Sequence, residues 1–270
     1  MRNPRPSAQE LRLRYEHDHY GADALEELLE SQLGFFKQKA RKLKLARGAR
    51  VVELGSYTGA FLQASTECGW DATGVDVGKD TAEFCLAHGL RVIRAELEQS
   101  KIAPNSIDAF FIWNTFDQLA HPKRTLESIR QLLKPGGFLL IRAPNGDFES
   151  AALNARANSR WRGSIMAAQA FNNFLTFPYI AGYTPRSLCL MLRAVGFEVI
   201  GINGDVIAPL FGERSPALAK SSEQKWKRLT LRVCERIAKN DHKLLHPWFE
   251  IVAVNSPHAD GRAETRISLG

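Results

Sequence analysis

The stretch "VVELGSYTGAFL", Val51 to Leu62, is the most informative part of this chain for its fold. β-Branched residues and a leucine flank a single acidic residue, and glycines at positions 55 and 59 lead into an apolar run that favours a helix. This pattern predicts a buried strand that enters a tight turn and then a helix. Turns that open a helix often hold the phosphates or sugar of a nucleotide. The stretch therefore predicts a cofactor site and leaves open which cofactor it holds.

Strand-like and helix-like patterns alternate around this stretch, from about Arg50 to Pro144. The expected strands are residues 49–54, 71–77, 90–97, 107–113 and 137–144, and the expected helices are residues 59–69, 81–89 and 121–137. The fourth strand, "IDAFFIW", is almost continuously apolar, as is typical of a central strand covered on both faces. The alternation predicts an α/β fold with a doubly wound, mostly parallel sheet and right-handed crossovers.

The alternation of strand-like and helix-like patterns ends after Asn145. Residues 146–182 contain no clear strand, and we expect a partly helical cover whose aromatic residues between Trp161 and Tyr179 form its core and line an acceptor pocket. A helix that starts at Thr184-Pro185 with a following strand, an amphipathic helix over 222–240 and a last strand over 247–254 complete the pattern. We expect five segments: helical residues 1–49, a cofactor-binding half at 50–144, the cover at 145–182, the rest of the domain at 183–255 and a flexible tail at 256–270.

The composition is that of a globular protein, with 44% hydrophobic and 24% charged residues. No run of 18 apolar residues occurs, and the N-terminus lacks the apolar core of a signal peptide, so we expect a cytoplasmic protein without a membrane span. Four scattered cysteines follow no metal-ligand spacing, and we expect no metal site. The net charge of +7 could favour an anionic partner, but no RNA-binding signature accompanies it, so we interpret it as solvated helix faces.

Polar residues stand at the expected carboxyl ends of the strands, where open α/β sheets bind their ligands. Asp76 ends the second strand 21 residues beyond Gly55, and an acidic residue there can accept both ribose hydroxyls of a nucleotide. The glycine spacing is G-x-x-x-G, not the G-x-G-x-x-G of dinucleotide sites. Glu53 would repel a pyrophosphate but can hold an amine. A nucleoside that carries an amino acid therefore fits better than a dinucleotide.

Two longer stretches carry a family resemblance. "VVELGSYTGAFLQASTECGWDATGVDVGKDTAEFCLAHGLRVIRAELE" and "SIDAFFIWNTFDQLAHPKRTLESIRQLLKPGGFLLIRAPN" resemble the two halves of a class I S-adenosylmethionine-dependent methyltransferase. The most similar branch contains ubiquinone-biosynthesis O-methyltransferases and many sugar and natural-product methyltransferases. The resemblance implies a seven-stranded Rossmann-like sheet with an antiparallel last strand, "HPWFEIVAV", and S-adenosyl-L-methionine as cofactor.

The resemblance also implies which residues hold that cofactor. The first motif would wrap the methionine part, Asp76 would hold the ribose, and Val77 would pack on the adenine. Asn114 would lie near the methionine end, and Tyr20 would reach it from an N-terminal segment that folds over the cofactor in relatives. The implied cofactor-binding residues are Glu53, Gly55, Ser56, Tyr57, Gly59, Asp76, Val77, Glu96, Leu97, Asn114 and Tyr20.

Two positions depart from the family pattern. Tyr57 replaces a middle glycine, and a Cβ is tolerated there if the local φ is negative, so cofactor binding is not excluded. Many relatives carry Glu-His after the fourth strand, where this chain has Asp117-Gln118. The candidate catalytic bases are therefore His121, three residues further on, and His19 in "YEHDHYG". An ordinary surface or capping role is the alternative for both histidines.

The sequence thus favours methyl transfer to a small-molecule or sugar acceptor, with oxygen as the preferred acceptor atom. An NAD-dependent oxidoreductase would need the missing G-x-G-x-x-G. A non-catalytic relative that serves as a partner protein stays open because of Tyr57 and Gln118. An RNA methyltransferase is disfavoured, because base methylation often relies on Asn/Asp-Pro-Pro-aromatic after the fourth strand and this chain reads "NTFDQ".

Overall fold

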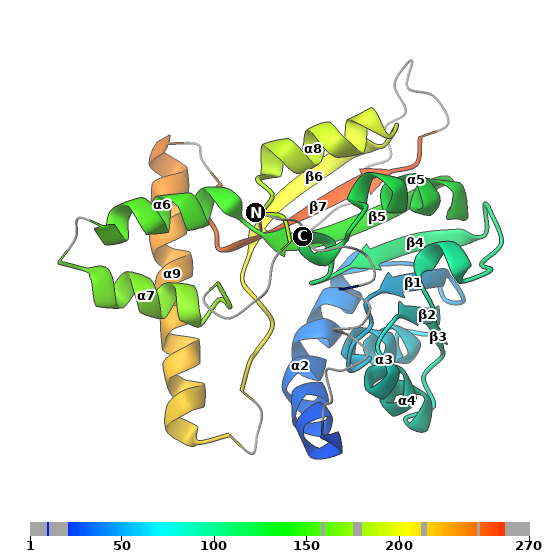
Figure 1. Ribbon diagram of the computed structural model, residues 1–270, viewed down its shortest axis with the longest axis horizontal. Coiled ribbons are helices and arrows are strands. Elements are labelled where there is room, and N and C mark those ends of the chain that lie inside the picture. Colours follow the sequence, from blue (N-terminus) through cyan, green and yellow to red (C-terminus); the bar gives the residue numbers. More distant parts are fainter. Residues whose placement is uncertain are drawn as a thin grey trace.

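A computed structural model describes residues 10, 21–157, 160–174, 180–211, 215–241 and 244–256 of the chain. Its centre is one sheet of seven strands in the order β3-β2-β1-β4-β5-β7-β6 (Figure 1). The strands are β1 (Arg50–Leu54), β2 (Asp71–Asp76), β3 (Val92–Arg94), β4 (Ile107–Ile112), β5 (Leu133–Pro144), β6 (Glu198–Asp205) and β7 (Trp248–Val254). Only β7 runs antiparallel to its neighbours, β5 and β6, which confirms the predicted fold class.

Helices cover both faces of the sheet (Figure 1). One face carries α2 (Ala22–Leu43), α3 (Ala60–Glu67) and α4 (Lys79–Ala87), and the other carries α5 (Pro122–Leu132) and α8 (Pro185–Ala194). Each face has its own apolar core, because successive side chains of a strand point to opposite sides. In β1, for example, Val51 packs with the α2 and α3 side and Val52 with the α5 and α8 side.

Local signals explain where several helices begin. Pro122 stands in the first turn of α5, where its missing N–H costs nothing. A capping box opens α8, in which Ser187 N donates to Thr184 Oγ1 at 3.1 Å and Thr184 N donates to Ser187 Oγ at 2.9 Å. These starts agree with the predicted positions. The fifth strand, in contrast, begins at Leu133 instead of 137, because Leu133 pairs with Ile107 before the register shifts.

The segment after β5 forms α6 (Gly146–Ala157) and α7 (Arg162–Ala170), which lie beside the long helix α9 (Ala217–Asp241) at one end of the sheet (Figure 1). The prediction of a helical cover is correct for this part of the described chain. The prediction that Trp161 belongs to the core of the cover is wrong, since 60% of this residue is exposed. Phe174 is buried against Ile207 and Trp248, and Phe177 and Tyr179 lie outside the described residues. No helix in the described ranges is long and apolar enough to cross a membrane.

The strand order places one crevice. β1 continues through α3 to β2 on one side, whereas the chain returns to β4 on the other side of β1. Loops that leave β1 and β4 therefore diverge, and a parallel sheet opens at such a switch point, at the carboxyl ends of the strands. Glu53 and Phe111 pair there across β1 and β4. The predicted motif residues follow directly after this pair.

Candidate active site

A cavity of about 660 Å³ lies at the carboxyl ends of β1, β2 and β4. This volume is in the range of small-molecule sites, which is about 300–1,000 Å³. The predicted cofactor residues that line it are Glu53, Gly55, Ser56, Tyr57, Asp76, Val77, Glu96, Leu97 and Asn114. Gly59 does not line the cavity but precedes α3, where an added Cβ would stand 2.4 Å from Leu90 Cδ1. Tyr20 and His19 lie outside the described residues.

The turn after β1 approaches the loop after β4 very closely. Gly55 has φ +74°, and a Cβ built on it would stand 2.0 Å from Thr115 Oγ1. Only glycine fits this position, because it lacks the Cβ and adopts positive φ without strain. The turn is closed by a hydrogen bond from Gly59 N to Ser56 O at 2.8 Å. The missing side chain of Gly55 thus lets the loop after β4 close against the turn after β1.

Tyr57 adopts φ +47°, so the negative φ that would tolerate its Cβ is absent. The reason is the turn itself, in which the Tyr57 N–H points at Asp76 and donates to Oδ2 at 2.9 Å. A non-glycine residue in the left-handed region costs roughly 1–2 kcal/mol. The structure therefore keeps the turn geometry expected with glycine and holds Tyr57 in it under strain.

The carboxylate of Asp76 is fixed at the end of β2. Oδ1 accepts from Gly78 N at 2.8 Å, and Oδ2 accepts from Tyr57 N. Burial raises the pKa of this carboxyl, and the two backbone donors act against that rise. Oδ1 also accepts from Thr81 Oγ1 at 3.4 Å, whereas Oδ2 has a second lone pair, so Asp76 keeps capacity to accept from a ligand through Oδ2. The arrangement holds one acceptor group in a set orientation at the cavity wall.

Glu53 is 4% exposed, and its Oε2 atom has no hydrogen-bond partner within the described part of the chain. Burial, and secondarily the nearby Asp76, raise the pKa of Glu53 well above its usual value. Ser56 Oγ and Trp113 Nε1, two further buried atoms on cavity-lining residues, also lack partners among the residues that the structure describes. Buried polar atoms are nearly always paired, so the unpaired Oε2 of Glu53 is available to a ligand in the cavity.

The loop after β4 forms the next wall. Trp113 is 2% exposed and packs edge-on against Phe36 and Phe61, with ring centroids 5.4 and 4.9 Å apart. Asn114 Oδ1 accepts from Arg142 Nη1 at 2.9 Å, and Asn114 O accepts from Gln118 Nε2 at 2.8 Å. Trp113 is thus both a core residue and a wall of the cavity.

Two titratable residues follow in this loop. His121 is exposed, precedes α5 and lines the rim of the cavity. Asp117 is 1% exposed, and both of its carboxylate oxygens lack a partner in the described ranges. Burial raises the pKa of Asp117 to about 8. Asp117 therefore keeps its proton at pH 7. Its backbone oxygen accepts from Ile180 N and Ala181 N at 3.0 and 3.1 Å.

The second half of the cavity comes from the expected cover and from elements that the sequence did not connect with the site. Asn173 represents the cover, whereas none of its described aromatic residues lines the cavity, contrary to the expectation. The lining residues of this second half are Leu28, Gln32 and Phe36 of α2, Asn173 after α7, Ile207 and Leu210 after β6, and Trp248 of β7. The helical periodicity of the α2 segment predicts an apolar face, but it does not say that this face meets a ligand.

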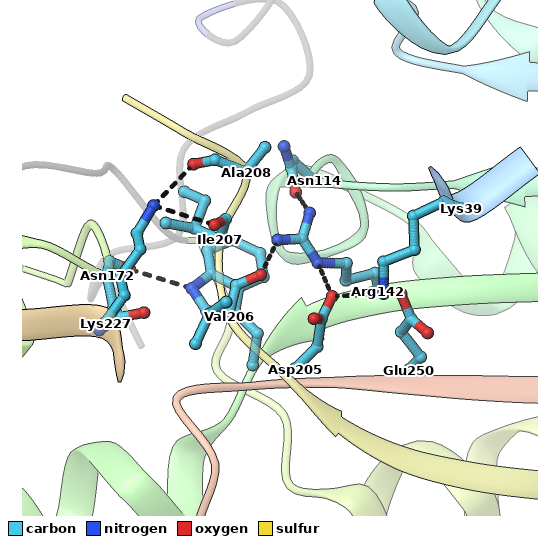
Figure 2. Close-up of polar contacts among 11 residues, drawn as sticks. Lys39, Asn114, Arg142, Asn172, Asp205, Val206, Ile207, Ala208, Lys227 and Glu250 are labelled. Atoms are coloured by element: carbon cyan, nitrogen blue, oxygen red, sulfur yellow. Dashed lines mark hydrogen bonds and ion pairs between the residues drawn. The ribbon is translucent and has the colours of Figure 1, made fainter. Parts of the chain in front are cut away.

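Polar contacts hold this second half in place (Figure 2). Lys227 Nζ of α9 donates to the carbonyls of Ile207 and Ala208 at 3.0 Å each. Trp248 Nε1 donates to the carbonyl of Asn172 at 3.0 Å. The loop after β6 and the end of α7 are therefore anchored to α9 and β7, and this half of the cavity is rigidly built and largely apolar.

Comparisons with known proteins agree with this geometry. A family described as a methyltransferase domain matches residues 17–202, which is more than half of the chain. The ubiquinone biosynthesis O-methyltransferase of Idiomarina loihiensis is 26% identical over 176 residues, which cover 61% of this chain and 68% of that enzyme. The enzyme of the same name from Methylococcus capsulatus is 22% identical over 176 residues, covering 62% of this chain and 70% of that enzyme.

Solved structures show the same fold. A SAM-dependent methyltransferase from Archaeoglobus fulgidus matches with a TM-score of 0.54 at 17% identity. The match covers 85% of this chain and 97% of the Archaeoglobus chain. Phosphoethanolamine N-methyltransferase 2 of Haemonchus contortus, in complex with S-adenosyl-L-methionine, has a TM-score of 0.58 at 13% identity, over 92% of this chain and 60% of that one. With the family match, the strand order and the cavity together, this chain belongs to the methyltransferase-domain family of the class I S-adenosylmethionine-dependent superfamily.

Proposed function

We propose that this enzyme moves a methyl group from S-adenosylmethionine to an oxygen atom of a small-molecule or sugar acceptor. The observation that carries the proposal is the mixed lining of the cavity. Two carboxylates at the ends of β1 and β2, Glu53 and Asp76, line it together with apolar residues of α2, the loop after β6 and β7, such as Phe36, Ile207 and Trp248. A cofactor with an amino acid and a ribose suits the carboxylates, and a compact organic acceptor suits the apolar residues.

The cavity residues fit the cofactor by the groups they offer. The orphan Oε2 of Glu53 would accept from the ammonium of the methionine part, and Asp76 would accept from the ribose hydroxyls. Val77 and Leu97 would pack on the adenine, and Glu96, which lines the same cavity, would lie at the edge of the adenine. An ammonium beside Glu53 would offset the burial that raises the pKa of this carboxyl.

When bound, the cofactor supplies a methyl group on a sulfonium, with a neutral thioether as leaving group. The protein then has to hold the acceptor oxygen in line and exclude water, and positioning supplies much of the acceleration. A base that removes the hydroxyl proton adds about a hundredfold or more. We propose His121 for this role, because it lies at the rim of the cavity and is accessible from solvent. His19, outside the described residues, is the second candidate.

Calorimetric titration with S-adenosylhomocysteine, with NADH as control, tests cofactor binding. We expect micromolar affinity for the first compound only, and we expect Asp76→Ala to weaken it by at least about ten-fold, because a charge-assisted pair of hydrogen bonds is lost. Unchanged affinity in that variant would remove Asp76 from the site.

A screen of labelled methyl transfer to phenols, quinone precursors and sugars tests the acceptor class. We expect product with a hydroxyl compound and none with RNA. Methylation of RNA with steep salt dependence would refute the proposed acceptor class, because binding that neutralises several phosphates weakens strongly with salt.

A further inference from the structure

Arg142 of β5 is fully buried directly behind the cavity wall, and its guanidinium is held from several sides (Figure 2). Nη1 donates to Asn114 Oδ1 at 2.9 Å, and Nη2 donates to the carbonyl of Val206. Nε forms an ion pair with Asp205 Oδ2 at 2.7 Å, although its alignment is not that of a hydrogen bond. The rings of Phe35 and Trp248 stand 5.1 and 5.0 Å from the guanidinium carbon.

The charge of Arg142 is balanced within a small network. Lys39 of α2 lies 3.1 Å from Asp205 and 2.6 Å from Glu250, so two cations face two carboxylates. The pKa of Asp205 is lowered in spite of its burial, because Arg142 and Lys39 attract its charge. Such buried networks are weak evidence for stability, since apolar residues of similar volume often serve as well or better. The network therefore calls for a role other than stability.

The contact with Asn114 gives Arg142 such a role. A guanidinium carries only donors, so the carboxamide oxygen of Asn114 must face Arg142 and its amide nitrogen must face away. Figure 2 shows Asn114 in this orientation, with the nitrogen on the side opposite Arg142. Gln118 Nε2 holds the backbone oxygen of the same residue at 2.8 Å. Asn114 thus enters the cavity wall as a preset hydrogen-bond donor.

The position of this donor indicates its target. Thr115, the next residue, lies against Gly55, and β4 pairs with β1 next to Glu53. An acceptor, Glu53, and a donor, the Asn114 amide, therefore come from adjacent strand ends that line one cavity. An α-amino acid group carries an ammonium and a carboxylate, and this pair complements both.

We propose that Arg142 is a positioning residue that orients the Asn114 amide toward the carboxylate of the cofactor's amino-acid group. The inference goes beyond the proposed function, because it concerns cofactor binding and holds for any acceptor. A hydrogen bond from the Asn114 amide to a carboxylate is charge-assisted, and such bonds are roughly twice as strong as neutral ones. A fixed orientation of this amide would therefore contribute substantially to cofactor affinity.

Calorimetry with two ligands tests the proposal. S-Adenosylhomocysteine carries the amino-acid group, and 5′-methylthioadenosine lacks it but shares the nucleoside. Asn114→Asp keeps an oxygen for Arg142 but replaces the amide donor by a second acceptor. It should therefore lower the affinity for S-adenosylhomocysteine by at least about ten-fold. Arg142→Lys, which retains the charge but loses the planar fork, should weaken it several-fold. Neither variant should change the affinity for 5′-methylthioadenosine by more than about two-fold.

A matched control separates positioning from structural damage. Lys39→Met disturbs the same network without touching Asn114, so it should lower the melting temperature but leave the ratio of the two affinities unchanged. In an Asn114→Ala background, Arg142→Lys should lower the melting temperature and leave S-adenosylhomocysteine affinity as it was. A further loss of affinity in that background, or equal losses for both ligands, would overturn the proposal.

The Asn114 variants keep the proposal testable if Arg142→Lys does not fold. An unchanged affinity ratio in Asn114→Asp would by itself refute the role of the amide. The acceptor screen fails or succeeds independently, because no acceptor takes part in these titrations.

Discussion

Replacing Asp117 with asparagine should stabilise the protein at neutral pH and flatten the dependence of its stability on pH. Asp117 is 1% exposed, and its two carboxylate oxygens have no partner among the described residues. Burial raises the pKa of this carboxyl from 3.8 to about 8. The folded protein therefore holds a proton on Asp117 at pH 7 that the unfolded chain has lost.

The sign of the effect follows from that difference in bound protons. The unfolded state releases the proton near pH 4 and the folded state near pH 8, so each unit of rising pH between these values favours unfolding. One proton corresponds to about 1.4 kcal/mol per pH unit. The free energy of unfolding of Asp117→Asn minus that of the wild type should therefore increase by about 3 kcal/mol from pH 5 to pH 7.

Urea denaturation of both proteins at pH 5, 6 and 7, with constant ionic strength, measures this difference. Subtracting the two curves removes the contribution of Glu53, whose pKa is also raised. Glu127→Gln, an exposed position on α5 with a 3.9 Å surface contact to Lys123, is the control and should change stability by no more than about 0.5 kcal/mol at any pH. Parallel curves for wild type and Asp117→Asn would show that the carboxyl is already ionised when folded, and the reasoning would fail.

Three other substitutions test the site. Tyr57→Gly should retain the affinity for S-adenosylhomocysteine, which calorimetry measures. It should raise the free energy of unfolding in urea by up to about 1 kcal/mol, because relief of the φ +47° strain outweighs the added freedom of the unfolded chain. Loss of binding would give the Tyr57 side chain a role in the site. Gly55→Ala should abolish detectable S-adenosylhomocysteine binding, because its Cβ would stand 2.0 Å from Thr115 Oγ1; normal binding would mean that the loop yields easily. His121→Ala should leave cofactor affinity intact, since the residue stands at the exposed rim; in the methyl-transfer assay, normal activity on a hydroxyl acceptor would exclude it as the base.

The order of the strands, most helices and the presence of Glu53, Gly55 and Asp76 at one cavity could be predicted from the sequence. These features depend on neighbours in the chain: alternating apolar runs, Pro122 and Thr184 at helix starts, and the Gly55 turn after β1. Asp76 could be placed beside that turn because parallel strands end at one edge of a sheet. Local periodicity and one topological rule were enough for this part.

Other features could not be predicted from local sequence, because burial and pairing depend on residues that are distant in the chain. The positive φ of Tyr57 follows from its hydrogen bond to Asp76, 19 positions away. In the sequence, Arg142 looks like an ordinary polar residue of a strand, and only the folded structure shows its contacts with Asp205 and Asn114. The apolar lining of the cavity joins α2, the loop after β6 and β7, and no local pattern states that these segments meet. Contacts of this kind form only when the whole chain has folded, and they fix side-chain orientation and charge.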